Sequence, residues 1–307
     1  MPISGCARLR AGAILGAMPT FEELVAEGAA VPTTGWDFSW FEGRATEERP
    51  SWGYAKLLAA RMARAGSALD VQTGGGEVLA TVPVAPPLLA ATESWPPNVP
   101  VARRHLAPLG ATVVEAAEAA ELPFPADTFD LVVSRHPVLI RWDEVHRVLR
   151  PGGTYLAQHV GAGTVRELAA YLRGPCPAPP TTPPPAATPA DPPVTTSGAS
   201  ATSAVEAAEA AGLEVLDVRQ EALRMEFHDI AAVVHFLRKV VWTVPDFTVE
   251  AYAERLAALH RFIERFGPFV AYAQRFLIEA RRPGGPDRSG GPCRPGQPDP
   301  SGGVSGR

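Results

Sequence analysis

Short apolar runs alternate with longer segments of helical periodicity through the middle of this chain. Five runs have the length and apolar content of buried strands, and they cover residues 67–71, 88–93, 111–114, 129–134 and 154–160. One segment before the first run, at 55–65, and two between later runs, at 97–109 and 142–149, space their apolar residues as helices do. This alternation predicts an α/β fold, in which a mostly parallel sheet carries helices on both faces.

The C-terminal part continues the pattern with longer helices. We expect a helix at 204–211, a strand at 212–219, and a final strand within 269–280. Two apolar helices, at 228–241 and 249–266, lie between these last strands in the sequence. Such an insertion predicts a helical cap. We expect the aromatic-rich segment before the first core helix, residues 21–54, to form the other half of this cap, as a lid over the site.

Proline and glycine divide the chain into parts. Residues 174–203 are dense in proline, which has no amide proton to donate, and we expect a disordered insertion there. Residues 1–20 form a flexible N-terminal extension, with Met18 as a candidate natural start, and residues 283–307 form a disordered tail. The predicted organisation is completed by a core at 55–173 and a second part of the sheet, with its cap, at 204–282.

Composition narrows the class of protein. The formal net charge is −5 and the apolar fraction is 46%, so nothing points to a nucleic-acid or membrane partner. No apolar run reaches the ~20 residues that span a bilayer. The cysteines Cys6, Cys176 and Cys293 form no paired motif, so we expect no metal site and a cytoplasmic location. The oligomeric state stays open.

A glycine-rich turn follows the first strand of the core. It reads Asp70-Val71-Gln72-Thr73-Gly74-Gly75-Gly76. Glycines let the backbone approach a ligand closely, and ligands of such sheets bind beyond the C-terminal strand ends. The glycine spacing differs from the G-x-G-x-x-G of dinucleotide folds, which argues against a nicotinamide dehydrogenase.

Four motifs in order give a specific resemblance. The turn at 70–76 is followed by the acidic strand end Thr92-Glu93, by the stretch from Leu122-Pro123-Phe124-Pro125 to Phe129-Asp130-Leu131-Val132, and by Glu144 to Gly153. Residues 67–160 resemble the class I S-adenosylmethionine-dependent methyltransferases of type 11. The resemblance implies a Rossmann-like fold and S-adenosyl-L-methionine as the cofactor.

The resemblance also implies roles for individual residues. Asp70 would orient the methionine amine of the cofactor, and Glu93 would accept hydrogen bonds from the ribose hydroxyls. Glu118 would lie near the adenine, although a solvated helix face explains this residue equally well. Gln72 departs from the family, because glycine is usual at its position. The implied cofactor-binding set comprises Trp52, Tyr54, Asp70, Gln72, Thr73, Gly74, Gly76, Glu93, Ser94, Glu118, Ala119, Ser134 and Arg135.

Methyl transfer needs positioning of the acceptor, and a base only where the acceptor must lose a proton. His136 and His159 follow the fourth and fifth strands and are the candidate catalytic residues; His228-Asp229, before the cap helix, is a further candidate. We expect transfer to a small-molecule acceptor. The alternatives are an RNA base methyltransferase, which the acidic charge disfavours, and a cofactor-binding protein without transfer activity, which Gln72 suggests.

Overall fold

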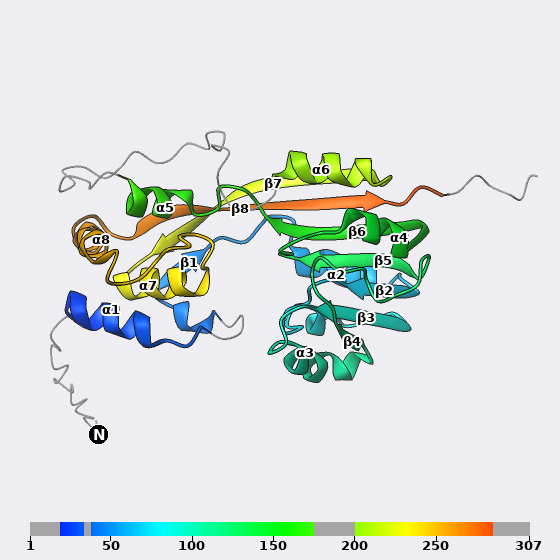
Figure 1. Cartoon of the computed structure of the whole chain (residues 1–307), viewed down its shortest axis with the longest axis horizontal. Helices are drawn as coiled ribbons and strands as arrows, with labels where there is room; N and C mark the ends of the chain where they lie inside the picture. The colour runs from blue at the N-terminus through cyan, green and yellow to red at the C-terminus, as the bar shows by residue number, and fades with distance from the viewer. Residues whose placement is uncertain (1–18, 34–37, 175–199, 285–307) are drawn as a thin grey trace, which may run out of the picture.

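The computed structural model describes residues 19–33, 38–174 and 200–284. The tail beyond 284, nearly all of the N-terminal extension and proline-rich insertion, and all three cysteines lie outside the described residues. In the described part, a single eight-stranded sheet has the order β1-β7-β8-β6-β5-β2-β3-β4 (Figure 1). The strands are β1 (Ala45–Glu47), β2 (Ser67–Asp70), β3 (Leu88–Glu93), β4 (Thr112–Glu115), β5 (Phe129–Arg135), β6 (Leu149–Val160), β7 (Glu214–Phe227) and β8 (Phe269–Arg281).

Five neighbouring strands at one side of this sheet form its parallel part. Parallel pairing joins β4, β3, β2, β5 and β6, whereas β8 pairs antiparallel with both β6 and β7. The C-terminal ends of the parallel strands therefore share one edge, where ligands of open α/β sheets bind. The predicted α/β sheet, mostly parallel and with helices on both faces, is confirmed.

Helices cover both faces of the core because the apolar residues of each strand alternate between two clusters. One cluster packs α2 (Tyr54–Met62) and α3 (Val99–Leu106) against Leu131, Val133 and their neighbours. The other packs α4 (Trp142–Val148) and α6 (Ala201–Ala210) against Val132, Tyr155 and their neighbours. The 3₁₀ turns η2 (Leu79–Thr81) and η3 (Ala107–Leu109) complete the first layer.

A second lobe lies beyond the shared edge of the core, and we call it the cap. The pairing of β6 with β8 ends at Val160 and Arg275, but β7 and β8 stay paired as far as Phe227 and Phe269. The extended parts of these strands carry the cap helices (Figure 1), which pack in a third apolar cluster. Its helices are α1 (Phe21–Ala30), α5 (Arg166–Arg173), α7 (Ile230–Lys239) and α8 (Ala253–Phe266), with the 3₁₀ turn η1 (Ser39–Phe41).

Local signals explain where the cap helices begin. The Thr20 hydroxyl accepts the amide of Glu23 while the Glu23 carboxylate accepts the amide of Thr20, a capping box that starts α1. Asp229 caps α7 by accepting the amide of Ala232 at 2.7 Å, and it also pairs with Arg44. The candidate His228-Asp229 therefore has a structural role at its aspartate, in the start of a helix.

The structure differs from the expected elements at several places. The strand expected at 212–219 runs on through Phe227, and the fifth strand begins at Leu149, before the expected 154. The sequence pattern predicts neither the short strand β1 nor the helix α5. The predicted cap helices between the last two strands are present, although α8 begins at Ala253, later than 249.

Candidate active site

The glycine-rich turn lies directly beyond β2 and needs glycine at two positions. Gly74 and Gly76 have φ angles of 65° and 80°, a region that disfavours other residues. At Gly76 an added Cβ would also lie 2.9 Å from Cγ of Leu106 on α3. The Thr73 amide donates to the Thr92 carbonyl at 2.9 Å, which fixes the turn against the end of β3.

Two buried carboxylates flank this turn. Asp70 ends β2 and accepts the Thr73 hydroxyl at 2.6 Å, while Glu93 ends β3 and accepts the amides of Gly74 at 2.7 Å and Trp95 at 2.9 Å. Burial raises the pKa of Asp70 to about 7; the Thr73 bond lowers it and the neighbouring Glu93 charge raises it further. The predicted Asp70 and Glu93 thus lie together around the turn.

Gln72 has a left-handed backbone conformation, which glycine adopts more readily than other residues. Its φ is 59°, in the left-handed region. Its side chain points to the loop after β5, where Gln72 Oε1 accepts the Val138 amide at 2.7 Å and Nε2 donates to the Leu139 carbonyl. We call this pair of bonds the Gln72 clasp. It joins the glycine-rich turn to residues 138–139.

A small cavity lies behind the clasp, on the side of the sheet where β3 and β4 end. Its volume is about 20 Å³, close to the smallest space that holds one water molecule. Gln72, Leu139 and Glu118 are among its lining residues. The Ser94 hydroxyl donates to the Glu118 carboxylate at 3.0 Å, and the Ala119 carbonyl accepts from Arg141 at 2.8 Å. The predicted Ser94, Glu118 and Ala119 therefore lie beside one another.

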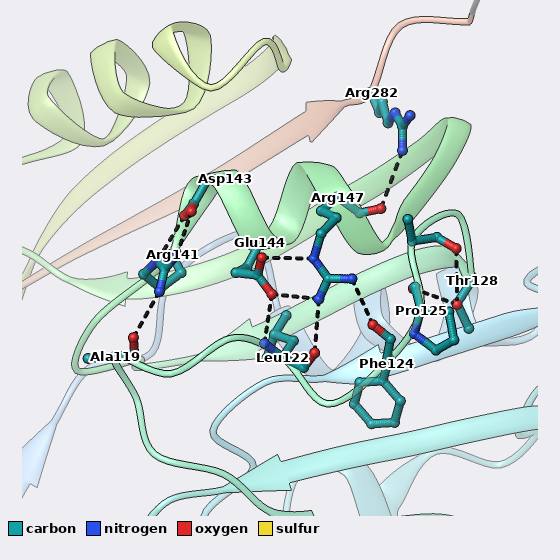
Figure 2. A network of polar contacts seen from close by, with 11 residues as sticks. Ala119, Leu122, Phe124, Pro125, Thr128, Arg141, Asp143, Glu144, Arg147 and Arg282 are labelled. Atoms are coloured by element: carbon teal, nitrogen blue, oxygen red, sulfur yellow. Dashed lines mark hydrogen bonds and ion pairs between the residues drawn. The ribbon is translucent and has the colours of Figure 1, made fainter.

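A hydrogen-bonded network holds the 119–128 loop in place (Figure 2). The Glu144 carboxylate accepts the Leu122 amide at 2.7 Å and pairs with Arg147 at 2.6 Å. Arg147 in turn donates to the carbonyls of Leu122 and Phe124, at 2.9 and 2.8 Å. The Glu144-x-x-Arg147 part of the family motif thus fixes the loop beside the small cavity.

The segment 47–54, which we call the strap, crosses the ends of the sheet from β7 to β5. Arg275 on β8 donates to Glu47 at 2.7 Å, and Glu221 on β7 accepts the Ser51 amide at 2.9 Å. Trp52 and Tyr54 are both buried in the strap. The Trp52 indole donates to Gln158 Oε1 at 2.8 Å, and the Tyr54 hydroxyl donates to the Ser134 carbonyl at 3.0 Å.

These contacts also fix the state of His136. Because the Gln158 oxygen accepts from Trp52, the Gln158 amide nitrogen is the donor to His136 Nε2, 2.8 Å away. The proton of neutral His136 is then on Nδ1. Burial, with the nearby Arg135, Arg275 and His159, lowers the pKa of His136 well below its usual value. His136 is accordingly a neutral hydrogen-bond donor through Nδ1.

His159 lies on the opposite face of the sheet from Gln158. Its ring stacks on Phe276 with centroids 4.5 Å apart, and its Nε2 lies 3.3 Å from the Tyr155 hydroxyl. Burial lowers the pKa of His159 to about 3. This packing is that of a structural histidine, so we correct the expectation that His159 contacts the acceptor. Ser134 is fully buried, and its hydroxyl donates to the Val71 carbonyl at 2.6 Å.

Arg135 is the last residue of β5 and shares one face of the sheet with Gln158 and Arg275. Its Cα partner is Gln158, and Arg275 is paired with Val160 two residues further along β6. Side chains two positions apart on a strand lie on the same face, so all three polar residues continue the face that packs against α2. Sequence reasoning missed Glu47, Gln158 and Arg275, because only the strand order brings them to this edge.

Comparison with known proteins agrees with this geometry. Residues 69–157 match the family model described as a methyltransferase domain. A Bacillus halodurans protein with a provisional methyltransferase assignment has a TM-score of 0.50 at 18% identity, over 75% of this chain and 98% of that one. The YcgJ protein of Bacillus subtilis gives 0.50 at 15% identity, with the same coverage. A search of curated proteins found no match.

Two further observations concern the described residues as a set. They include no helix that is long and apolar enough to cross a membrane. They also include no group of three or more histidine, cysteine or acidic side chains arranged to hold a metal ion. The matched segment contains the glycine-rich turn, both buried carboxylates and the Glu144–Arg147 pair. The chain therefore contains a methyltransferase domain at residues 69–157, and this domain implies an S-adenosylmethionine-dependent methyltransferase.

Proposed function

We propose that this protein binds S-adenosyl-L-methionine at the glycine-rich turn and transfers its methyl group to a small-molecule acceptor. The observation that carries the proposal is the pair of buried carboxylates, Asp70 and Glu93, at the ends of adjacent parallel strands on either side of the turn. Buried carboxylates need polar or cationic partners. The methionine amine and the ribose hydroxyls of this cofactor supply both.

The residues around the turn fit that cofactor in chemistry. Glu93 accepts two backbone amides, and a carboxylate has about four acceptor positions, so it can accept two ribose hydroxyls as well. Asp70 would face the cationic amine, with Thr73, Gly74 and Gly76 beside it. The pair of Ser94 and Glu118 would lie at the adenine, where the small cavity must widen to admit a ring.

On the acceptor side, the residues of this chain would orient the methyl acceptor. When bound, the cofactor offers a sulfonium methyl group, whose carbon–sulfur bond breaks as the acceptor nucleophile bonds to that carbon. His136 would donate a hydrogen bond from Nδ1 to the acceptor, because Nε2 already accepts from Gln158. Trp52 and Tyr54 hold the strap over this edge and would keep water from it.

Calorimetry with S-adenosylhomocysteine tests the cofactor site. Glu93→Ala should weaken binding by about 1–3 kcal/mol, the scale of hydrogen bonds to a charged group. Glu121→Ala is the matched control, since Glu121 is exposed, belongs to the same acidic stretch as Glu118 and should leave the affinity unchanged. Equal affinities for wild type and Glu93→Ala would show that the ribose site is elsewhere.

Labelled methyl transfer tests the acceptor class. Wild-type protein and labelled cofactor are incubated with a small-molecule fraction of cell extract and with total RNA. We expect label in the small-molecule fraction, insensitive to ribonuclease. Label in RNA would replace the small-molecule proposal, and tight binding without transfer to either fraction would identify a cofactor-binding protein.

A further inference from the structure

His136, directly after β5, has an unusual backbone conformation. Its φ is 59°, in the left-handed region that residues other than glycine seldom adopt. Residues in such conformations cluster at active sites and ligand sites, and they persist only where the surrounding structure holds them. The His136 amide donates to the Gln158 carbonyl at 2.7 Å. The backbone of Gln158 on β6 is therefore one support of this conformation.

The side chain of Gln158 also holds the ring of His136. This side chain is buried, and its Nε2 lies 2.8 Å from His136 Nε2. Its Oε1 accepts the indole N–H of Trp52 at 2.8 Å. An indole nitrogen can only donate, so the amide cannot turn over without losing this bond and bringing two donors together. Trp52 thereby fixes which end of the Gln158 amide faces the histidine.

The strap is bonded to both strands beside this histidine. Trp52 reaches β6 through Gln158, and the Tyr54 hydroxyl reaches β5 at the carbonyl of Ser134, two residues before His136. The two aromatic side chains are buried, so the strap holds the indole in one place. Displacement of the strap would take the indole away from Gln158 and leave the amide free to turn over.

The other ring nitrogen of His136, Nδ1, is left for a ligand. No group in the described part of the chain bonds to it. Because Nε2 accepts from Gln158, the single proton of the neutral ring is on Nδ1. Burial keeps the ring neutral, since it lowers the pKa of His136 well below its usual value. The ring therefore offers a bound molecule an N–H donor and no lone pair, so it can orient that molecule but cannot take a proton from it.

We propose that Gln158 is a positioning residue for methyl transfer: held by Trp52 of the strap, it keeps His136 in the form that donates from Nδ1 to the acceptor. This inference rests on the proposed function, since it explains how His136 becomes a donor there. It goes further in making that donor depend on the docked strap. It also restricts the acceptor to molecules that present an oxygen or nitrogen lone pair to His136 and whose nucleophile needs no base from it.

Nitrogen NMR of the histidine rings tests the role of Gln158 without any ligand. The full chain is labelled at its histidine ring nitrogens, two-bond proton–nitrogen spectra identify the protonated nitrogen of each ring, and His136→Gln assigns the signal of His136. Wild type should carry the proton on Nδ1. Gln158→Glu supplies a carboxylate that accepts from both Trp52 and the histidine, so Nε2 should become protonated. Trp52→Phe should make the Nε2–H form appear beside the Nδ1–H form.

Labelled methyl transfer to the small-molecule fraction of cell extract connects this tautomer with the reaction. Gln158→Glu should lose about tenfold in transfer, the equivalent of one hydrogen bond, and should bind S-adenosylhomocysteine as wild type does. Gln220→Glu makes the same change at an exposed position of β7. This control should match wild type both in the tautomer of His136 and in transfer.

Several results would overturn the proposal. One is a proton on Nε2 of His136 in wild type, and another is a proton on Nδ1 alone in Gln158→Glu. Full transfer by a Gln158→Glu chain with a changed tautomer would show that the reaction does not depend on this donor. An unchanged tautomer in Trp52→Phe would overturn the dependence on the strap. Absence of S-adenosylhomocysteine binding by wild type would overturn the proposed function instead, because the tautomer is measured on the free chain.

Discussion

Asp70 has a pKa near neutrality because burial disfavours its charged form. At pH 7 the side chain is therefore divided between carboxylic acid and carboxylate. His136 and His159, whose pKa values burial lowers, stay neutral across the same range. Among these three residues of the site, Asp70 is the one whose charge changes between pH 6 and 8.

We expect the affinity for S-adenosyl-L-methionine to rise about tenfold from pH 6 to pH 8, because the cationic amine needs the carboxylate of Asp70. Calorimetry across this range measures it, and Asp70→Asn should give a flat profile. Stability should change in the opposite direction. The pKa is raised from 3.8 to about 7 on folding, so this group's contribution to the free energy of unfolding decreases as pH rises between those values. A wild-type affinity that is independent of pH would contradict the assignment.

At the scale of single residues, Gln72 gives a second prediction. The clasp has to open before the small cavity can widen, so Gln72→Ala and Gln72→Gly should both bind S-adenosylhomocysteine more tightly than wild type, by about threefold to tenfold. Only glycine also relieves the left-handed backbone, and Gln72→Gly should be about 1 kcal/mol more stable than Gln72→Ala. Calorimetry and urea denaturation measure the two effects. Weaker binding by both variants would mean that the Gln72 amide helps to hold the cofactor.

At the scale of elements, α4 determines the position of the 119–128 loop through two side chains. Glu144 is buried, and Arg147 supplies its counter-charge and donors for two loop carbonyls (Figure 2). Arg147→Ala should lower the free energy of unfolding by about 2–4 kcal/mol, since a buried carboxylate loses its cation. Urea denaturation measures the loss. The control Arg173→Ala breaks an exposed pair with Asp246 and should cost under about 1 kcal/mol; equal losses would show that the loop does not depend on Arg147.

The elements of the core could be predicted because each strand is apolar and ends at a recognisable motif. The expected end of β7 at 219 is too early, although the second half of the strand alternates polar residues with Leu223, Met225 and Phe227, the pattern of a half-buried strand; its partner β8 lies some fifty positions further along the chain. The residues of the site are likewise hard to predict from the sequence alone. Gln158 and His159 are adjacent in sequence, yet a strand turns them to opposite faces, and only pairing with β5 and β8 shows which face meets the strap.

At the scale of the whole molecule, the cap and the core share β7 and β8 (Figure 1). The cap helices depend on close packing of α1 against α7, where Gly28 touches the backbone of Ala231 and has no room for a Cβ. Gly28→Ala should therefore destabilise the cap by about 1–3 kcal/mol. Hydrogen exchange should show faster opening of α1 and α7, with little change in β2 and β5. Ala26→Ser, on the exposed face of α1, is the control; unchanged protection of α1 in Gly28→Ala would contradict this account of the packing.

The shared strands also have a kinetic consequence. A lobe that is joined to its core by two continuous, paired strands has no hinge about which it can swing as a rigid body. Ligand exchange must then proceed by local release of residues 138–139, which are exposed and held by the Gln72 clasp, or of the strap, which is held by hydrogen bonds and by the burial of Trp52 and Tyr54. We expect residence times of bound ligands to be set by the opening of these two segments and to be insensitive to changes that stiffen the sheet.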